Sequence, residues 1–347
     1  MRRIVGAAAV AFAISQLALP AYEARADAIA DFYKSKPMVL SVGSAVGSGF
    51  TIYARLISRH MPRYIPGAPT IVIENLPGAS GLRHMDHLVT VAPKDGSTIG
   101  LLNPSVAAAP LLTPELAKHR SDKLAWIGSA NSEVSTCMFW PHVNVKDIED
   151  LKTRELVIGG SGAAGSSGIG AEALRSIFGF KWKIISGYQG SADIMIAGAR
   201  REIDGACILL MSALRAQYWE QFQRGEFKIM LQMPPGNHPD LPGVINTIDL
   251  AQNEEQRLAL EFIYGYWAFG RPFAAPAGVP ADRLQVLRAA LKATLEDPQF
   301  LADSKKIGVS VDYMGHAELD RRVKAIENTP ASVVAKVRAL VPAHKAP

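Results

Sequence analysis

The chain has 347 residues, of which 48% are hydrophobic and 20% charged, and its formal net charge is +5 at pH 7. This length is enough for two domains of ordinary size. The charge is too weak to favour nucleic acid as a partner, and no basic run with interleaved aromatic residues occurs. No Cys and His residues have zinc-ligand spacing, so no metal site is predicted.

The first residues have the pattern of a secretory signal peptide. Residues 1–3 carry two arginines, residues 4–19 are mostly apolar, and residues 24–26 form an A-x-A cleavage site. We predict that residues 1–26 are removed and that the mature chain starts at Asp27. This cleavage removes three of the 37 basic and one of the 32 acidic residues, so the net charge becomes +3. A membrane anchor is the alternative, but the apolar run is shorter than the ~20 residues that a span requires.

Short apolar runs then alternate with amphipathic segments almost throughout the chain. Strands are predicted at 38–42, 70–73, 98–102, 156–158, 182–185, 203–209 and 228–231, and helices at 51–64, 82–91, 168–178, 192–199, 281–295 and 316–340. This alternation indicates βαβ units and largely parallel sheets. No low-complexity linker divides the chain. If there are two domains, segments 124–140 and 203–231 are the best candidates for the connections between them.

The two cysteines, Cys137 and Cys207, each lie in an apolar, strand-like segment. Buried free thiols are the favoured interpretation. Export also makes a disulfide possible, but sequence spacing alone does not show whether the two Cα atoms lie within disulfide reach.

Three predicted junctions between a strand and a helix are rich in Gly and Ser: 43-GSAVGSGFT-51, 77-PGASG-81 and 159-GGSGAAGSSG-168. Small residues expose backbone N–H groups there, and the N-terminus of the following helix adds a partial positive charge. Each junction is therefore a candidate anion site, suited to phosphate or carboxylate.

Gly160, Gly162 and Gly165 form a literal G-x-G-x-x-G. A dinucleotide site needs an acidic residue at the end of the next strand, and segment 182–188 contains none, so this alternative is disfavoured. The Walker sequence and the G-x-S-x-G elbow are also absent. Asp204 is the one acidic residue at a strand and turn near the predicted site. Two interpretations of Asp204 remain open: its side chain contacts the ligand, or its carboxylate accepts backbone N–H groups within a turn.

Two segments, 70-TIVIENLPGASG-81 and 92-APKDGSTIGLL-102, resemble a signature of the Bug family, the extracytoplasmic solute receptors of tripartite tricarboxylate transporters. Further similar segments follow in the same order: 161-SGAAGSSG-168, 188-YQG-190, 203-IDG-205, 238-HPDLPGV-244 and 275-APAGVPADRLQVLRAAL-291. No single segment is decisive, but the series is specific.

The resemblance implies an α/β fold of the two-domain periplasmic-binding-protein type (type II, Venus-flytrap), with discontinuous domains and mixed, mostly parallel sheets. We expect domain 1 to comprise residues 27–128 and 229–347, and domain 2 residues 129–228. A small carboxylate would bind between the domains. The implied ligand-binding residues are Ser44, Gly47, Ser48, Gly49, Thr51, Asn103, Ser105, Ser161, Gly165, Ser166, Ser167, Tyr188 and Asp204.

The chain departs from the family pattern at two of these loops. Thr51 stands where the family commonly has Asp, and Ile169 where it commonly has His. Loss of the Asp puts amino-acid ligands in doubt. Phe50 and Tyr53 add aromatic surface beside the first loop, or else pack in the core.

We therefore expect a periplasmic solute-binding protein with no catalytic residues, no metal and no cofactor. Its expected ligand is a small carboxylate, the membrane permease subunits of a tripartite transporter are candidate partners, and the receptor itself is expected to be a monomer. The alternatives are an exported receptor that feeds a signalling system and, less favoured, a periplasmic enzyme on the same fold.

Overall fold

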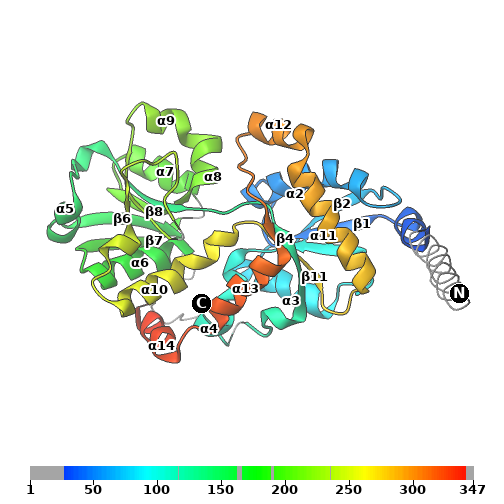
Figure 1. Ribbon diagram of the computed structural model, residues 1–347. Helices are drawn as coiled ribbons and strands as arrows, with labels where there is room; N and C mark the ends of the chain where they lie inside the picture. The colour runs from blue at the N-terminus through cyan, green and yellow to red at the C-terminus, as the bar shows by residue number, and fades with distance from the viewer. Residues whose placement is uncertain (1–26, 116, 162–165, 189–190, 235, 341–347) are drawn as a thin grey trace, which may run out of the picture.

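The computed structural model describes residues 27–115, 117–161, 166–188, 191–234 and 236–340, and the predicted signal peptide lies outside these ranges. Two six-stranded sheets lie side by side, and helices cover both of them (Figure 1). The α/β architecture with two sheet-centred halves confirms the predicted fold class.

The first sheet has the strand order β12-β4-β11-β3-β1-β2. Its strands are β1 (Met38–Val42), β2 (Ile71–Asn75), β3 (Thr98–Leu101), β4 (Leu124–Ser129), β11 (Pro272–Pro276) and β12 (Met314–Gly315). The pairs β1–β2 and β1–β3 are parallel, whereas β11 is antiparallel to both β3 and β4. Strands β1 to β4 therefore run in one direction, and β11 and β12 run in the other.

The second sheet has the order β10-β9-β5-β8-β6-β7. Its strands are β5 (Ser135–Phe139), β6 (Leu156–Ser161), β7 (Trp182–Tyr188), β8 (Gly205–Leu210), β9 (Lys228–Gln232) and β10 (Ile245–Asn246). Only β5 runs against the other strands, because it is antiparallel to its neighbours β8 and β9. Both sheets are thus mixed, with most strands in one direction.

The chain passes between the two sheets at 130–134, as expected, because β4 lies in the first sheet and β5 in the second. The second expected connection is wrong. Strands β8 and β9 both belong to the second sheet, so the chain returns only between β10 and β11. The boundaries of the two domains remain a prediction. The pairing of β9 with β10 indicates that the second half of the molecule continues beyond β9. We propose that the second domain extends to at least Asn246 instead of ending at residue 228.

The helices follow the predicted alternation. Around the first sheet lie α2 (Gly49–His60), α3 (Leu82–Thr90), α4 (Ala109–Leu112), α11 (Ala281–Glu296), α12 (Pro298–Lys306) and α13 (His316–Glu327). Around the second lie α5 (Ile148–Thr153), α6 (Ser166–Phe178), α7 (Ser191–Ala199), α8 (Met211–Ala213), α9 (Trp219–Gln223), α10 (Glu254–Tyr264) and α14 (Ala331–Leu340). The single helix predicted at 316–340 is wrong. It is two helices, because Pro330 disfavours helical backbone at the residue before it.

Apolar side chains of the strands and of the inward helix faces form the core. One cluster packs Leu40 of the first sheet against Ile57 of α2 and Leu287 of α11. A larger cluster joins the two halves, since it contains Trp126 of β4 as well as Leu260 of α10. The two halves therefore share a continuous apolar contact beside the connections.

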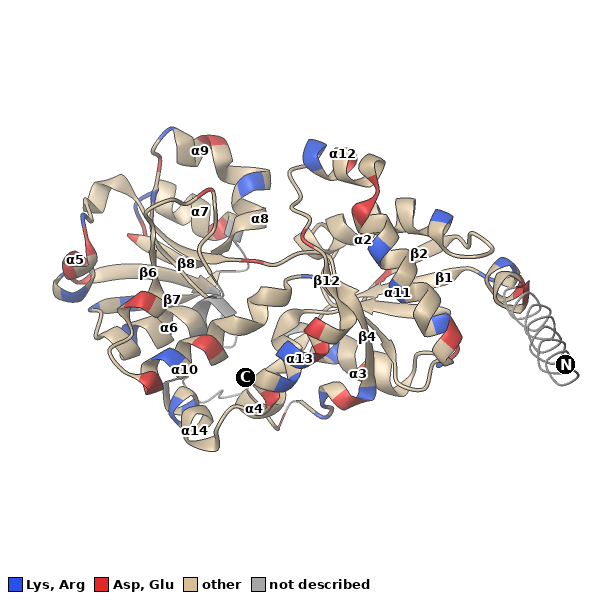
Figure 2. Cartoon of the chain, viewed as in Figure 1, with Lys and Arg blue, Asp and Glu red and all other residues tan. Residues whose placement is uncertain are grey.

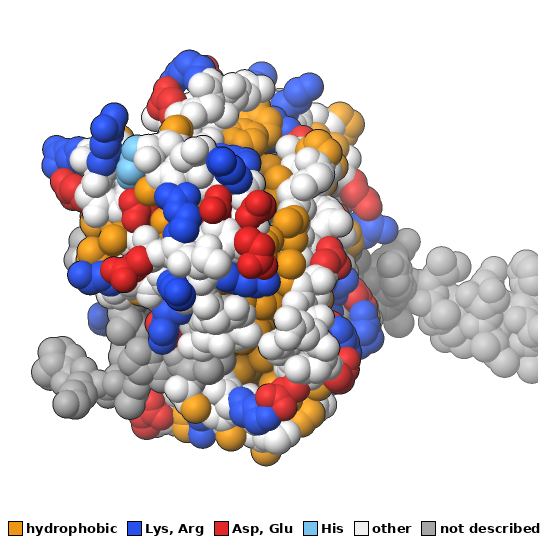
Figure 3. Space-filling model, turned by 90° about the vertical axis from the view of Figure 1, so that its left-hand side faces the viewer, with side chains coloured by type: hydrophobic (Ala, Val, Ile, Leu, Met, Phe, Trp, Pro, Cys, Tyr) orange, Lys and Arg blue, Asp and Glu red, His pale blue; other side chains and the backbone are white. Residues whose placement is uncertain are grey.

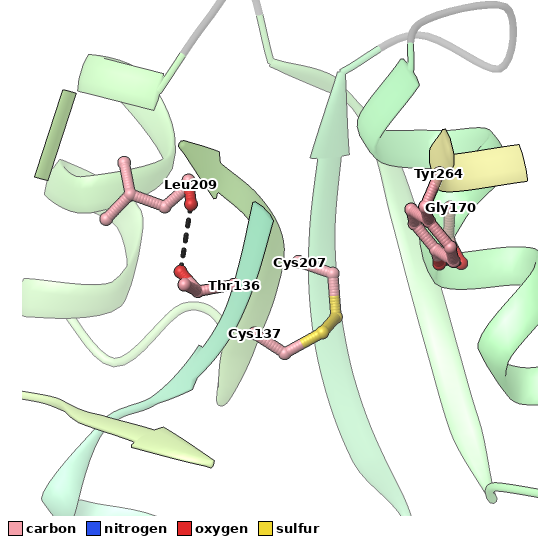
Figure 4. The surroundings of a disulfide bond; sticks show 6 residues. All are labelled: Thr136, Cys137, Gly170, Cys207, Leu209 and Tyr264. Atoms are coloured by element: carbon pink, nitrogen blue, oxygen red, sulfur yellow. Dashed lines mark hydrogen bonds between the residues drawn. A yellow bond between two sulfur atoms is a disulfide. The ribbon is translucent and has the colours of Figure 1, made fainter. Parts of the chain in front are cut away.

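The expectation of free thiols is wrong, because Cys137 of β5 and Cys207 of β8 form a disulfide (Figure 4). The two residues are cross-strand partners, and their Cα atoms lie 4.0 Å apart. Next to them, the Thr136 hydroxyl donates to the Leu209 carbonyl at 2.9 Å. The apolar pattern identified both strands, but only their antiparallel pairing brings the thiols together.

Basic and acidic residues are interspersed on the helices of both halves (Figure 2). On the face shown in Figure 3, Lys and Arg side chains likewise lie next to Asp and Glu. That face is therefore not the uniformly basic surface that a nucleic acid backbone selects. Within the described ranges, no helix combines the length and apolarity needed to cross a membrane.

Candidate functional site

The carboxyl ends of the parallel strands from both sheets meet at the connections. Strands β1, β3 and β4 end on one edge of the first sheet, and the connection 130–134 leaves from that edge. It enters β5 at Ser135, which pairs with Leu210 at the carboxyl end of β8. The predicted loops follow β1, β3 and β6, so they lie at these adjoining edges. Ligands of open α/β sheets bind at such carboxyl ends.

The first Gly/Ser loop forms the N-terminus of α2. Ser48 is the N-cap residue, and its Oγ accepts the N–H of Thr51 at 3.3 Å. The hydroxyls of Ser44 and Ser48 lie 2.6 Å apart, and Gly47 has φ +88°, which favours glycine. Because the first N–H groups of a helix have no intrahelical acceptor, those of Gly49 and Phe50 are donors for an anion.

Thr51 supports this loop from behind. Its side chain is buried, its hydroxyl donates to the Ala45 carbonyl at 3.1 Å, and it accepts from Asn75 Nδ2 at 3.0 Å. Asn75 Nδ2 also donates to the Ser44 carbonyl at 2.8 Å. We therefore correct the role of Thr51 from ligand contact to loop support. Asn75 was not among the predicted site residues, although it lies within the segment that carries the family resemblance.

Asn103 and Ser105 form a turn at the carboxyl end of β3. Asn103 Oδ1 accepts the backbone N–H of Ser105 at 3.0 Å and its hydroxyl at 2.9 Å. The second Gly/Ser junction packs against this turn, since a Cβ on Gly81 would lie 2.8 Å from the Asn103 Cβ. The structure therefore brings Asn103 and Ser105 to the same edge as the first loop, with Gly81 of the second junction packed against them.

The third Gly/Ser junction follows β6. Ser161 ends this strand and pairs with Tyr188 at the end of β7. Ser166 and Ser167 are the first residues of α6, whereas Gly165 lies outside the described residues. The Tyr188 ring covers Gly159, where a Cβ would lie 3.3 Å from it. Ser161, Ser166 and Tyr188 thus belong to the edge of the second sheet that adjoins the connections.

Asp204 lies at the opposite end of the second sheet, where β6 and β8 begin. Its carboxylate accepts the N–H of Val157 at 2.7 Å, and its Oδ1 lies 3.3 Å from His142 Nε2. The carboxylate therefore stabilises the entry of the strands. This position contradicts the predicted ligand contact, so Asp204 is removed from the candidate site.

Sequence reasoning missed a buried ion pair at the connections. Arg271, just before β11, and Glu133, in segment 130–134, have side chains that are 3% and 1% exposed, with Nη2 and Oε1 3.3 Å apart. Arg271 also stacks over Phe50 of α2, with its guanidinium carbon 4.3 Å from the ring centroid. A lone charge within the apolar run 266-YWAFGRPFAAP-276 was the signal that could have identified it.

His84 of α3 is buried beneath the first loop. Its Nε2 lies 2.8 Å from the Ser41 hydroxyl, and a Cβ on Gly43 would lie 2.9 Å from its Nδ1. Burial lowers the pKa of His84 to about 3, so the ring is neutral at physiological pH. A neutral imidazole anchors the end of β1 without adding charge to the site.

Gly308, after α12, touches the second half of the molecule. A Cβ at this position would lie 3.1 Å from the Cα of Ala216, which follows α8, and Figure 1 shows the segment on the side of α12 that faces α8. Gly308 has φ +71°, which almost equals the +72° of Gly225, whose Cβ position is open among the described atoms. Alanine would therefore cause similar backbone strain at both positions, but only at position 308 would it also press against the other half.

We expect Gly308→Ala to destabilise the fold more than Gly225→Ala. Both changes incur the ~1–2 kcal/mol cost of a left-handed alanine, but only Gly308→Ala also places a methyl group 3.1 Å from the Ala216 Cα, where the neighbouring backbone has to shift. Chemical unfolding of the two variants measures the difference. Equal losses of stability would contradict the contact.

Other features of the described chain lie away from these loops. A cavity of about 570 Å³ is lined mainly by α10 and α13, with Phe262, Arg322 and Ile326 in its wall, and none of the predicted site residues lines it. No group of three or more His, Cys, Asp or Glu residues that could hold a metal occurs in the described ranges. The Gly/Ser loops at the connections remain the best candidate site.

Two sheet-centred halves, joined by segment 130–134 and by the chain between β10 and β11, with Gly/Ser loops at the junction, are the architecture of two-domain solute-binding proteins. Residues 54–338 match the family model described as the tripartite tricarboxylate transporter family receptor (TctC). The match covers most of the chain, and the protein belongs to this family of solute receptors.

Three solved structures illustrate the similarity. An R. palustris protein with adipate has a TM-score of 0.67 at 17% identity, over 88% of this chain and 97% of that one. MatC from Rhodopseudomonas palustris with bound malate has a TM-score of 0.62 at 16% identity, over 88% and 99%. The periplasmic binding protein BugD has a TM-score of 0.59 at 21% identity, over 88% and 94%. At these identities the similarity establishes the fold. A search of curated proteins gives no match.

Proposed function

We propose that this receptor captures a small carboxylate between its two domains and releases it to the permease subunits of a tripartite transporter. The observation that carries the proposal is the Ser48-capped N-terminus of α2, which offers backbone N–H groups and two adjacent hydroxyls to an anion at the junction of the two sheets. Adipate and malate, bound in two proteins of the same fold, are consistent with this ligand class.

The proposed ligand contacts come from both halves. They are Ser44, Gly47, Ser48, Gly49, Asn103, Ser105, Ser161, Gly165, Ser166, Ser167 and Tyr188. The neutral, hydroxyl-rich character of these residues favours binding through hydrogen bonds. Closure of the domains about the two connections would then remove the ligand from water.

We further propose that the protein is a periplasmic monomer, exported through the signal peptide at 1–26, and that it binds its ligand without turnover. The first proposal is supported by the family, whose members are receptors, and by the A-x-A cleavage pattern. The absence of a triad or elbow motif in the sequence supports the second.

A thermal-shift screen of the mature protein tests the ligand class. The panel contains adipate, malate, a tricarboxylate, an aromatic acid and an amino acid, each with its neutral amide as a matched control. We expect at least one acid, and not its amide, to raise the melting temperature, because a ligand that binds only the folded state stabilises it.

The Ser48→Ala variant should show a smaller shift with the same acid, because it loses both a ligand donor and the helix cap. A cap alone contributes ~1 kcal/mol, so the shift is compared with that variant's own ligand-free melting temperature. Failure of every acid to stabilise the wild-type protein would overturn the proposed function.

A further inference from the structure

The Arg271–Glu133 pair joins three segments that are distant in sequence. From one side, the Arg271 guanidinium covers the rings of Phe50 and Tyr53, at 4.3 and 5.0 Å from their centroids. From the other side, its Nη2 lies 3.3 Å from the Ser212 hydroxyl of α8. One side chain therefore contacts both the helix of the proposed ligand loop and the second half of the molecule.

Glu133 completes the same connection. Its Oε2 accepts the backbone N–H of Ser212 at 3.2 Å, and its Oε1 accepts from Asn131 Nδ2 at 3.0 Å. Ser212 is thus held by the carboxylate through its backbone and by the guanidinium through its hydroxyl. Any rotation of the second half about segment 130–134 must change these contacts.

The guanidinium also approaches the proposed anion site itself. Its Nη2 lies 3.3 Å from the position of a Cβ on Gly49, in the first turn of α2. Its Nε is buried and has no acceptor among the described residues. An anion bound at that turn would lie close to a charge held in low dielectric, where electrostatic interactions are much stronger than in water.

We propose that Arg271 is the positioning residue that couples an anion at the Ser44–Thr51 loop to the placement of the second domain. The coupling rests on the proposed function of that loop as the carboxylate site. An anion near Gly49 favours the arrangement in which the guanidinium lies against α2. That arrangement is also the one in which Glu133 and Arg271 hold Ser212.

The competing explanation is a purely structural ion pair. Buried pairs are weak evidence for stability, and the loss of either partner leaves an uncompensated charge or an unpaired group. A structural pair would therefore lower the stability of both single variants and leave the affinity for an anion unchanged. Coupling instead requires opposite effects of the two charges on anion affinity.

Hydrogen exchange of the ligand-free protein tests the connection without any assumption about the ligand. We expect Arg271→Met to speed the exchange of backbone amides both in 44–51 and in 210–214. The matched control is Arg283→Met. Arg283 also stacks on a ring, with its guanidinium carbon 3.5 Å from the Phe32 centroid, and donates to the Asp95 carbonyl at 2.8 Å, and both of these contacts lie within the first half. Unchanged exchange in 210–214 would overturn the proposal.

Calorimetry with the best acid from the screen tests the coupling to the ligand. We expect Arg271→Met to weaken binding by at least about tenfold, and Glu133→Gln to strengthen it, because Gln removes the compensating charge and keeps the shape. Equal affinities for both variants and the wild type would identify the pair as structural and overturn the coupling.

If the wild type binds none of the acids, the proposed function fails, while the exchange experiment still decides whether Arg271 connects the two halves. If Arg271→Met does not fold, Arg271→Gln, which also removes the charge but keeps a hydrogen-bond donor, replaces it in the comparison with Glu133→Gln.

Discussion

Replacement of both cysteines, by Cys137→Ala and Cys207→Ala together, is expected to lower the free energy of unfolding by about 4 kcal/mol. The disulfide closes a loop with a sequence separation of 70 residues, and a cross-link of that length removes about this much chain entropy from the unfolded state. The bond joins β5, which directly follows the connection 130–134, to β8, whose end leads to Ser212. Its loss should therefore loosen the centre of the second sheet.

Urea unfolding of the variant and of the wild type, with and without a reductant, measures this effect. The wild type should lose stability when a strong reductant opens the bond, while the double variant should not respond. Detection of two free thiols in the oxidised, exported protein, with no response to reductant, would contradict the disulfide.

Acidification from pH 7 to pH 5 is expected to remove about 2 kcal/mol of stability through His84 alone. The pKa of His84 is about 3 in the folded protein, because burial disfavours the charged ring, and its unfolded value is 6.5. The unfolded chain therefore binds a proton that the folded chain does not. The stability is fully present above pH 6.5 and falls as the pH drops towards 3.

Two other histidines, His238 and His316, have pKa values lowered in the same direction by burial, so the controls must include them. We expect His84→Gln to be less stable at pH 7 but to show a flatter profile between pH 7 and pH 5. His238→Gln and His316→Gln should largely keep the wild-type slope, since these rings are less buried than His84. An unchanged slope in His84→Gln would contradict the neutral buried ring.

Elements with a local signal could be predicted from the sequence. Strand β1 has the predicted limits, and α2 begins two residues earlier than predicted because Ser48 caps it. Two helices that were not predicted still carry local start signals. Helix α10 follows Asn253, whose side chain accepts the N–H of Gln256, and α12 begins with Pro298 after Asp297.

The candidate site was predicted less completely than the fold. Glycine and serine at the ends of β1 and β6 identified the loops, because small residues at a strand-to-helix junction expose backbone donors wherever the junction lies. The role of Thr51 was assigned incorrectly, because its hydroxyl points back to Ala45 and Asn75. Asp204 was misplaced, because it precedes β8 and so lies at the opposite end of the sheet from the loops.

The sequence by itself determined the alternation of strands and helices, the Gly/Ser junctions and the resemblance to a receptor family, because each depends on residues close together in the chain. Only the tertiary structure decided that Cys137 pairs with Cys207, that β9 stays in the second sheet, and that Arg271 contacts Phe50, Glu133 and Ser212. These contacts depend on strand order and on the meeting of two sheet edges. The spacing of residues along the chain encodes neither the strand order nor the meeting of the sheet edges. The proposed coupling between the Ser44–Thr51 loop and the second domain is therefore visible only in the folded molecule.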